Sequence, residues 1–388
     1  MPTAPKSPES FAAGLGSAPE IELLCADVGT RLALRCLDQG DAITLHRWSL
    51  RGEALLKHEL DLLEQTEGVR LEERNATWEL SISPTALTQL SASAPLGKLL
   101  VACTNATLRP TARPLVMGIV NVTPDSFSDG GKWLDPIAAI NHGLQLVADG
   151  ADVLDIGGES SRPGASPIDE IEELRRVMPV IEGLAACTST PLSIDSTKSA
   201  VARAALDAGA SWVNDISAGL QEPQMLPLVA ERSAVFVAMH RKGDPLNMQT
   251  APSYKDCLGE VCEHLRERAA ACLTIGIAPN KLILDPGIGF GKTLEHNLDL
   301  MSRLRELRSL GAPLLVGPSR KAFIEQVNSA AEDADGLASL PFQRLGGTAA
   351  AISLCIDRGA EVFRVHDVRM MVEAARVAHA LSSHKVTP

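Results

Sequence analysis

Polar and charged residues suited to substrate chemistry follow a series of short apolar runs between residues 115 and 366. Buried Asp and Asn side chains offer acceptors and mixed donors, which suit a flat heterocycle bearing amino, ring N–H and carbonyl groups. An arginine fork beside an imidazole suits the oxygens of a phosphate. The pattern therefore predicts a ligand with two unlike ends. The residues are Asn121, Asp155, Glu159, Asp195, Asn214, Asp215, His240, Asp285, Ser319, Lys321, Arg364 and His366.

Eight apolar runs must position these side chains. Continuous apolarity is typical of parallel strands covered on both faces, and helical patterns such as Ile168–Leu184 and Leu294–Leu310 supply the crossovers. Eight such units in roughly 270 residues predict an α/β fold, a (β/α)8 TIM barrel over residues 115–384, with its site at the C-terminal strand ends. A doubly wound open sheet is the alternative. The runs are Leu115–Val122, Val153–Gly157, Leu192–Asp195, Trp212–Ile216, Ala234–Met239, Leu282–Asp285, Leu314–Gly317 and Val362–Val365.

The two ends of the ligand are expected to contact different units of the barrel. Asp195, Asn214 and Asp285 are the predicted heterocycle contacts. Lys321, Arg364 and His366 come from the seventh and eighth units, where TIM barrels often bind phosphate. A strand-end cap is the ordinary alternative for any one residue, and Arg364 could instead form a surface ion pair with Asp367. Polar residues at all eight strand ends favour a shared pocket.

The segment Gly287–Thr293 contains Gly-Lys-Thr, which also ends the phosphate-binding P-loop. That motif requires glycine at position 286, where this chain has proline, and the spacing does not fit a dinucleotide fingerprint. ATP and dinucleotide sites are therefore not predicted. The glycines are expected instead to let the backbone approach a flat ligand beside Asp285.

Two long loops, residues 121–131 and 157–164, follow the first two runs and are rich in Gly, Ser and Pro. Loops at a barrel rim can close over a substrate and exclude water. Phe127 and Arg162 are unusual choices for purely solvated turns. We therefore favour a role at the pocket over plain surface loops.

The composition narrows the possible partners. A net charge of −12 with pI near 5.3 opposes nucleic-acid binding, which needs clustered Lys and Arg. The eight cysteines are scattered without a CxxC pair, so we expect reduced, mostly buried thiols. The N-terminus lacks an apolar signal region, and the longest apolar run, 348–356, is too short to span a bilayer. We expect a cytoplasmic protein without membrane partners.

The first 114 residues have a different organisation. Residues 1–19 are rich in Pro, Ala, Ser and Gly, which predicts a disordered tail. Residues 20–107 hold alternating runs at 31–35, 42–46 and 77–82 and a helical stretch near 52–64, which predict a small N-terminal α+β module of undefined role. Two prolines between Arg109 and Pro114 indicate a linker at 108–114.

Seven segments resemble the dihydropteroate synthase family. Met117–Gly131 and Asp155–Ala165 resemble its two signature segments, and the resemblance extends from about Leu115 to the C-terminal helix. It implies a folate-pathway transferase that condenses 6-hydroxymethyl-7,8-dihydropterin pyrophosphate with p-aminobenzoate, giving 7,8-dihydropteroate and pyrophosphate. It further implies a homodimer and a sulfonamide target. The other segments, in the family's order, are Ser193-Ile-Asp-Ser, Asn214-Asp-Ile, Asp285-Pro-Gly-Ile-Gly-Phe-Gly-Lys, Ser319-Arg-Lys and Arg364-Val-His-Asp-Val.

The resemblance also implies a role for each site residue. The pterin contacts are Asp195, Asn214, Asp285 and Lys321. The pyrophosphate contacts are Asn121, Arg364 and His366, with Asn121 near a Mg²⁺ ion. The p-aminobenzoate contacts are Ser161, Arg162, Pro163 and Lys321. In the family mechanism pyrophosphate leaves first and the arylamine then attacks a pterin-methyl cation, so the candidate catalytic residues are Asp125, Lys321 and Arg364.

Three departures from the family pattern are present. Ser161 and Ser196 stand where the family usually has Thr, and each keeps a hydroxyl. The stretch Met239–Gly243 lacks the Met and Gln that commonly follow the histidine, which removes one pterin-packing contact.

Two alternative functions share parts of this pattern. A pterin-dependent methyltransferase on the same barrel should lack the Ser319–Lys321 and Arg364–His366 segments. A catalytically silent pterin-binding paralogue should have damaged loops. This chain has both segments and both loops, which favours the synthase.

Overall fold

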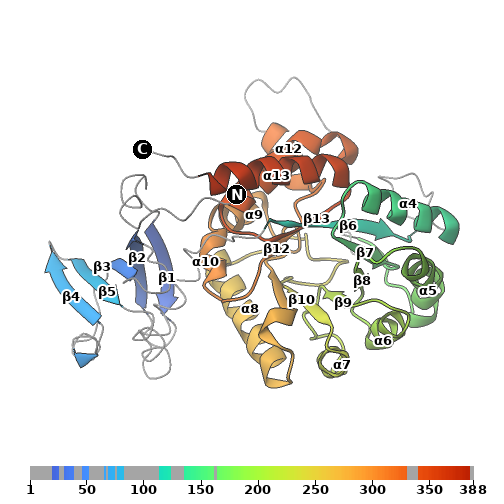
Figure 1. The fold of residues 1–388 in the computed structure, drawn as a ribbon, viewed down its shortest axis with the longest axis horizontal. Helices are drawn as coiled ribbons and strands as arrows, with labels where there is room; N and C mark the ends of the chain where they lie inside the picture. The colour runs from blue at the N-terminus through green and yellow to red at the C-terminus, as the bar shows by residue number, and fades with distance from the viewer. Residues whose placement is uncertain are drawn as a thin grey trace, which may run out of the picture. The chain divides into compact units, whose positions relative to one another are not determined.

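A computed structural model of the chain describes residues 20–25, 30–38, 46–51, 65–66, 69–74, 77–82, 113–123, 135–160, 164–329 and 340–384. These residues contain an antiparallel sheet in the N-terminal part and a parallel sheet in the remainder (Figure 1).

The N-terminal sheet has five antiparallel strands in the order β1-β2-β3-β5-β4. The predicted alternating runs at 31–35 and 77–82 fall within β2 and β5. The helical stretch predicted near 52–64 lies outside the described residues, as do the tail at 1–19 and residues 108–112 of the linker. The strands are β1 (Glu20–Cys25), β2 (Thr30–Asp38), β3 (His46–Arg51), β4 (Val69–Arg74) and β5 (Thr77–Ile82).

The second sheet has eight parallel strands, and it confirms the predicted (β/α)8 barrel. Its order is β11-β10-β9-β8-β7-β6-β13-β12, and a parallel bridge between Leu284 and Leu314 joins the two ends. That closure excludes the open doubly wound sheet. The strands are β6 (Leu115–Asn121), β7 (Val153–Gly157), β8 (Leu192–Asp195), β9 (Trp212–Asp215), β10 (Val235–Met239), β11 (Leu282–Asp285), β12 (Leu315–Val316) and β13 (Val362–Val365).

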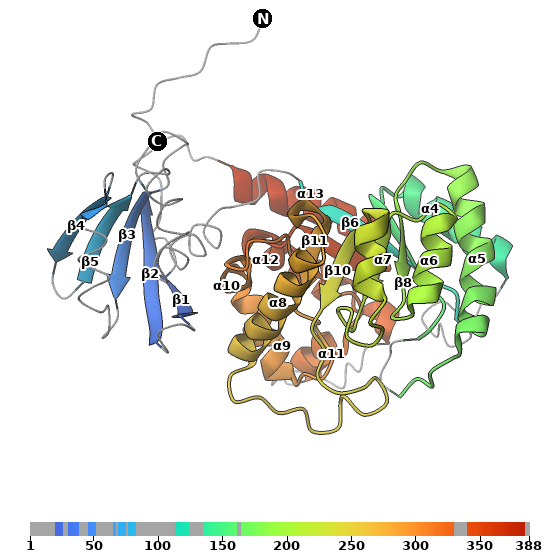
Figure 2. The same ribbon diagram turned by 90° about the horizontal axis from the view of Figure 1, so that it is seen from below.

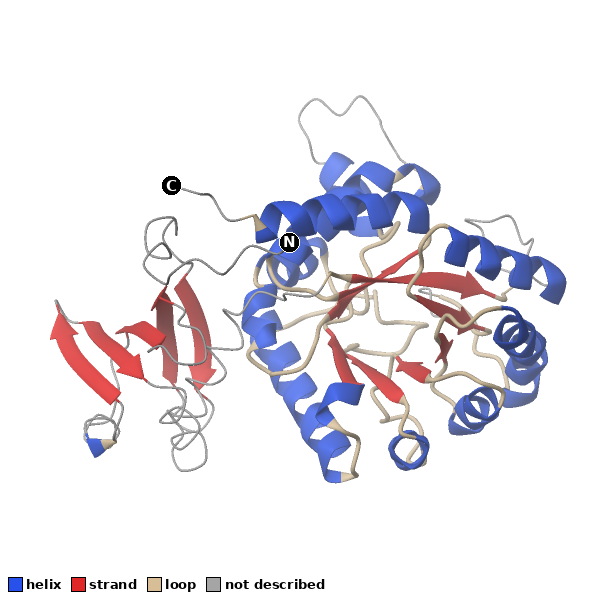
Figure 3. Cartoon of the chain, in the orientation of Figure 1, coloured by secondary structure: helices blue, strands red, loops and turns tan. Residues whose placement is uncertain are grey.

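Helices surround this barrel, and Figures 2 and 3 show α4 to α7 packed side by side along it. No described helix is long and apolar enough to cross a membrane. The helices are α4 (Pro136–Ala148), α5 (Glu170–Cys187), α6 (Ser199–Asp207), α7 (Met225–Arg232), α8 (Cys257–Thr274), α9 (Leu294–Ser302), α10 (Leu304–Arg308), α11 (Ala322–Ser329), α12 (Leu345–Asp357) and α13 (Val368–Ser383), with short 3-10 turns at Pro279–Lys281 and Pro341–Gln343.

Side-chain hydrogen bonds explain where two of the predicted helices begin or end. The helix expected from residue 168 begins at Glu170, because the Asp169 carboxylate accepts the Glu172 N–H at 2.8 Å. The helix expected over 294–310 is interrupted after Ser302, whose hydroxyl donates to the Asp299 carbonyl at 2.8 Å and competes with the backbone ladder. α8 contains three cysteines, of which Cys257 and Cys272 are buried and Cys262 is partly buried.

The barrel interior is filled by apolar side chains. A buried cluster joins residues of β6, β7, β10, β11, β12 and β13. A packed interior makes the barrel a rigid support rather than a pore, so the residues at the carboxyl ends of its strands have fixed positions. The cluster consists of Met117, Val153, Val237, Ile283, Leu315 and Val362.

Candidate active site

A cavity of about 940 Å³ opens at the carboxyl ends of the barrel strands. Every described residue to which the family resemblance gives a role lines it, although these residues come from six different strand ends. Met239, Ile288 and Phe290 give it apolar walls. Asp125, Ser161, Arg162 and Pro163 lie outside the described residues. The lining residues that were predicted are Asn121, Asp195, Asn214, Asp285, Lys321, Arg364 and His366.

An ionic network forms the floor of this cavity. Arg364 donates from Nε to Asp155 Oδ2 at 2.6 Å and from Nη2 to Asp195 Oδ2 at 2.7 Å. Asn214 Nδ2 donates to the same Asp155 oxygen at 3.0 Å. The four side chains come from β13, β7, β8 and β9. Because Asp155 and Asp195 share one guanidinium, their negative charges can lie close together at the base of the site.

The carboxyl groups of Asp195 and Asp285 bind protons more tightly than usual. Burial raises the pKa of Asp195 to about 7, with Arg364 opposing the shift and the Asp155 charge adding to it. Burial also raises the pKa of Asp285 to about 6, against the Gly287 N–H, which donates to Oδ1 at 2.7 Å. An N–H donor of a ligand would favour the ionised form of either carboxyl. Both residues are therefore suited to accept hydrogen bonds from a heterocycle.

Lys321 also lines the cavity, and it directly precedes α11. Its Nζ lies 4.1 Å from the centre of the Phe290 ring, a cation–π contact. Arg320 precedes it with a left-handed φ of 59°, and the Arg320 N–H donates to Thr348 Oγ1 at 3.2 Å. A Cβ at Gly289 would lie 3.2 Å from Lys321 Cδ, so glycine leaves room for the lysine stem. This turn directs the ammonium group to the same ligand space as Asp285.

Ser319 and His366 link the seventh and eighth strand ends. Ser319 Oγ lies 3.0 Å from His366 Nδ1 and accepts the His366 N–H at 3.2 Å. The surface ion pair considered for Arg364 is absent from the described residues, because Asp367 accepts hydrogen bonds from Arg320 at 2.6 and 2.9 Å. Arg364 and His366 thus both remain at the cavity.

Comparisons with known proteins identify the family to which this chain belongs. The pattern of the family described as "Pterin binding enzyme" matches residues 117–366. Dihydropteroate synthases of Synechocystis sp. and Escherichia coli K12 are each 44% identical to this chain, over 69% and 71% of it and 90% and 94% of their own lengths. The chain belongs to the dihydropteroate synthase family.

Solved structures of the family give the same result. The Yersinia pestis dihydropteroate synthase, solved as a sulfonamide drug complex, is 43% identical with a TM-score of 0.66, over 70% of this chain and 95% of that one. The Xanthomonas albilineans dihydropteroate synthase, solved with 4-aminobenzoic acid, is 47% identical with a TM-score of 0.64, over 70% and 94%.

Two strand-end residues serve the structure of this synthase-family barrel rather than its cavity. Asp215 accepts the backbone N–H groups of Ser217 at 2.7 Å and Gly219 at 2.8 Å, so it caps a turn. His240 Nδ1 lies 2.9 Å from Lys292 Nζ, and burial lowers the pKa of His240 to about 2. These two residues therefore make structural contacts at their strand ends, which was the alternative to a role in the pocket.

The Gly-Lys-Thr segment has no free lysine. Lys292 is 3% exposed, and its Nζ donates to the Phe290 carbonyl at 3.1 Å as well as contacting His240. Burial lowers the pKa of Lys292 to about 7. Lys292 therefore lines the cavity with its ammonium group held by contacts within the protein.

Two glycines of the segment Gly287–Thr293 do not serve the predicted purpose, which was to let the backbone approach a flat ligand. Gly287 and Gly291 have φ angles of 70° and 64°, and a Cβ at either would overlap the backbone carbonyl of His240 or Lys242. Their lack of a side chain lets two loops of the protein approach each other. In this segment only Gly289 borders the cavity among the described glycines.

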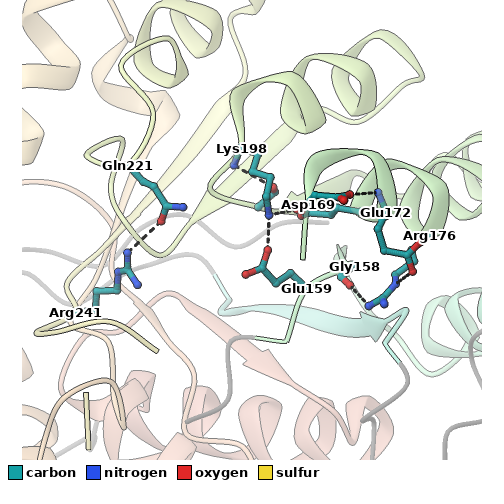
Figure 4. Close-up of polar contacts among 10 residues, drawn as sticks. Gly158, Glu159, Asp169, Glu172, Arg176, Lys198, Gln221 and Arg241 are labelled. Carbon is teal, nitrogen blue, oxygen red and sulfur yellow. Dashed lines mark hydrogen bonds and ion pairs between the residues drawn. The ribbon is translucent and has the colours of Figure 1, made fainter. Parts of the chain in front are cut away.

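Three charged residues that the sequence did not point to, Glu173, Arg176 and Lys198, hold the exit of β7, where the second long loop begins (Figure 4). Lys198 Nζ bridges Glu159 and the fully buried Glu173, the latter at 2.6 Å. Arg176 Nη1 donates to the Gly158 carbonyl at 2.9 Å. Glu159 also lines the cavity. The partners lie 18 to 39 positions away in the chain, so no local motif signals them.

Proposed function

We propose that the protein is a dihydropteroate synthase, which joins 6-hydroxymethyl-7,8-dihydropterin pyrophosphate to p-aminobenzoate. The observation that carries the proposal is the single cavity in which buried acceptors face a lysine and an Arg–His pair. Family relatives support it, since a Xanthomonas albilineans dihydropteroate synthase has been solved in complex with 7,8-dihydropteroate.

The pterin ring is proposed to lie over the floor of the barrel. Asp195 and Asp285 accept hydrogen bonds from its amino and ring N–H groups, and Asn214 adds a further polar contact. Lys321 donates to an acceptor on the ring, while Met239 and Ile288 cover its faces. A site that pairs every polar edge of a heterocycle rejects analogues that leave one of its buried groups unpaired.

The pyrophosphate is proposed to lie at the junction of β6 and β13, which are neighbours in the sheet. Arg364 and His366 contact its oxygens, and Asn121 would hold Mg²⁺ together with the pyrophosphate oxygens. Among the described residues no three His, Cys, Asp or Glu side chains form a metal cage. A single Asn oxygen nevertheless fits Mg²⁺, which usually keeps waters and takes one or two protein ligands plus substrate phosphates. When bound, the ion would neutralise charge on the leaving pyrophosphate.

The arylamine is proposed to bind beside Lys321, bordered by Ser161, Arg162 and Pro163 of the second loop. In the reaction, the bond between the pterin methylene carbon and the pyrophosphate oxygen breaks, and its electron pair leaves with pyrophosphate. The amine nitrogen then forms the new C–N bond and loses a proton. Asp125 offsets positive charge on the pterin methylene, while Arg364 and Lys321 orient the reacting groups.

A coupled assay tests this function. Pyrophosphate release and 7,8-dihydropteroate formation should both require the two substrates together. Asp285→Ala should abolish saturable use of the pterin substrate and leave the circular dichroism spectrum unchanged. Pterin binding without turnover would instead indicate a silent paralogue, and methyl transfer without pyrophosphate release a methyltransferase.

The assembly and location of the protein are also proposals. A homodimer follows from membership of the family, and the acidic composition supports the absence of nucleic-acid partners. Five described cysteines without disulfides support a reducing compartment, and we propose the cytoplasm. Sedimentation of the purified protein tests the dimer.

A further inference from the structure

Asp155 is a fully buried carboxylate beneath the cavity, and it has two partners that line the cavity. Its Oδ2 accepts from Arg364 Nε at 2.6 Å and from Asn214 Nδ2 at 3.0 Å. Asp155 itself does not line the cavity. It therefore acts on a bound ligand through Arg364 and Asn214.

The contact with Asp155 decides which way the Asn214 amide points. The carboxylate of Asp155 forms an ion pair with Arg364, and an ionised carboxylate only accepts hydrogen bonds. The NH₂ group of Asn214 must therefore face Asp155, and the carbonyl must face away from it. A flipped amide would place two acceptor oxygens against each other in a buried site, which is costly.

The Asn214 carbonyl is available for a ligand. Asn214 is 4% exposed and lines the cavity. Among the described residues, the side-chain hydrogen bond of Asn214 is the one from Nδ2 to Asp155. With Nδ2 turned down to the floor, Oδ1 is the atom that this residue offers to the space above.

We propose that Asp155 is a positioning residue that fixes the Asn214 amide with its carbonyl toward the pterin, so that Asn214 accepts an N–H of the heterocycle. This inference rests on the proposed function, since it assigns a polarity to one pterin contact. The same carboxylate also fixes the guanidinium plane of Arg364, whose Nη2 reaches Asp195. One buried residue thereby sets the orientation of contacts at both ends of the substrate.

Asp155→Asn and Asp155→Leu are compared first. In Asp155→Asn the amide oxygen can take the place of Oδ2 and accept from both Arg364 and Asn214, so the Kd for the pterin pyrophosphate should stay close to the wild-type value. Asp155→Leu removes this shared oxygen and leaves the Asn214 amide without the partner that fixes its orientation. The Kd for the pterin pyrophosphate should then rise by about tenfold, the loss of one buried hydrogen bond. The KM for p-aminobenzoate should change far less. Ser193→Ala is the matched control, because Ser193 is buried and pairs with Asp155 in the strand register.

A double-variant comparison keeps the proposal falsifiable if Asp155→Leu is less stable. Asn214→Ala removes the amide through which Asp155 is proposed to act. Adding Asp155→Leu to Asn214→Ala should therefore weaken pterin binding by less than Asp155→Leu does in the wild-type protein.

Binding is measured by calorimetry, and folding by circular dichroism and thermal melting. Wild-type pterin affinity in folded Asp155→Leu, an equal loss in Asp155→Asn, or fully additive losses in the double variant would overturn the inference. A wild-type protein without turnover on both substrates would instead overturn the proposed function.

Discussion

Arg364 Nη2 and Asp195 Oδ2 lie 2.7 Å apart, although the two residues are separated by 169 positions in the chain. β13 carries the guanidinium and β8 the carboxylate, so the contact crosses the top of the barrel. Arg364 also pairs with the buried Asp155. The arginine proposed to contact pyrophosphate is therefore also the cation that allows the buried carboxylate of Asp155 and the partly buried carboxylate of Asp195 to coexist.

Arg364→Met should damage both stability and activity. It leaves Asp155 and Asp195 without their shared cation, and removing one partner of a buried ion pair costs about 3–5 kcal/mol. Urea unfolding and kcat/KM for the pterin substrate measure the two effects. Arg175→Met is the control, because the Arg175–Glu172 pair is largely exposed and one helical turn apart. Equal stability of the two variants would contradict a structural role for Arg364.

Asp285→Asn should change the pH dependence of stability in a defined direction. The folded-state pKa of Asp285 is raised to about 6, so the folded protein binds this proton more tightly than the unfolded chain. Its contribution to stability is complete below the ordinary aspartate pKa near 4 and is lost as the pH rises through about 6. The variant cannot ionise there, so its stability relative to wild type should increase by on the order of 2–3 kcal/mol from pH 4 to 7.

Denaturant unfolding without ligand, at pH 4.5 and pH 7.5, measures this difference. A relative stability that is the same at both values would show that Asp285 is not held partly protonated. The variant should bind pterin weakly at either pH, because an amide cannot replace a carboxylate that accepts from two ligand N–H groups. Ser302→Ala, at the exposed end of α9, is a control without a titrating group.

The sequence was sufficient to predict the barrel and most of the residues around its cavity. Continuous apolar runs identify buried parallel strands, and a polar residue just after each run identifies the rim. The sequence was not sufficient to predict the direction in which each side chain points. Asp215 and Asn214 are adjacent, yet one caps a turn and the other lines the cavity. The partners of Asp155 and Lys198 come from distant segments, and only the folded chain brings them together.

Sulfonamides should inhibit turnover in competition with p-aminobenzoate. The loop Ser160–Pro163 has no insertion and Ser161 is small, so the proposed arylamine site has room for an inhibitor of similar shape. Initial rates are measured at several concentrations of sulfonamide and p-aminobenzoate. In a double-reciprocal plot the lines should meet on the rate axis, because a competitive inhibitor leaves the maximal velocity unchanged. Inhibition that excess p-aminobenzoate fails to relieve would place the inhibitor elsewhere. Replacing Ser161 with a bulky residue should weaken the inhibitor more than the substrate.

A chain that begins at Leu108 should keep its synthase activity. The family pattern covers residues 117–366, and the eight barrel strands run from Leu115 to Val365, so no barrel strand comes from the first 107 residues. The proposed site residues likewise all follow Leu108. We expect turnover to be largely retained. The sequence of residues 20–107 contains apolar runs that need a packing partner, so their removal should lower solubility or change the oligomer. The measurement is kcat at saturating substrates beside the circular dichroism spectrum. A truncated protein that is folded but inactive would mean that the N-terminal residues supply part of the active site.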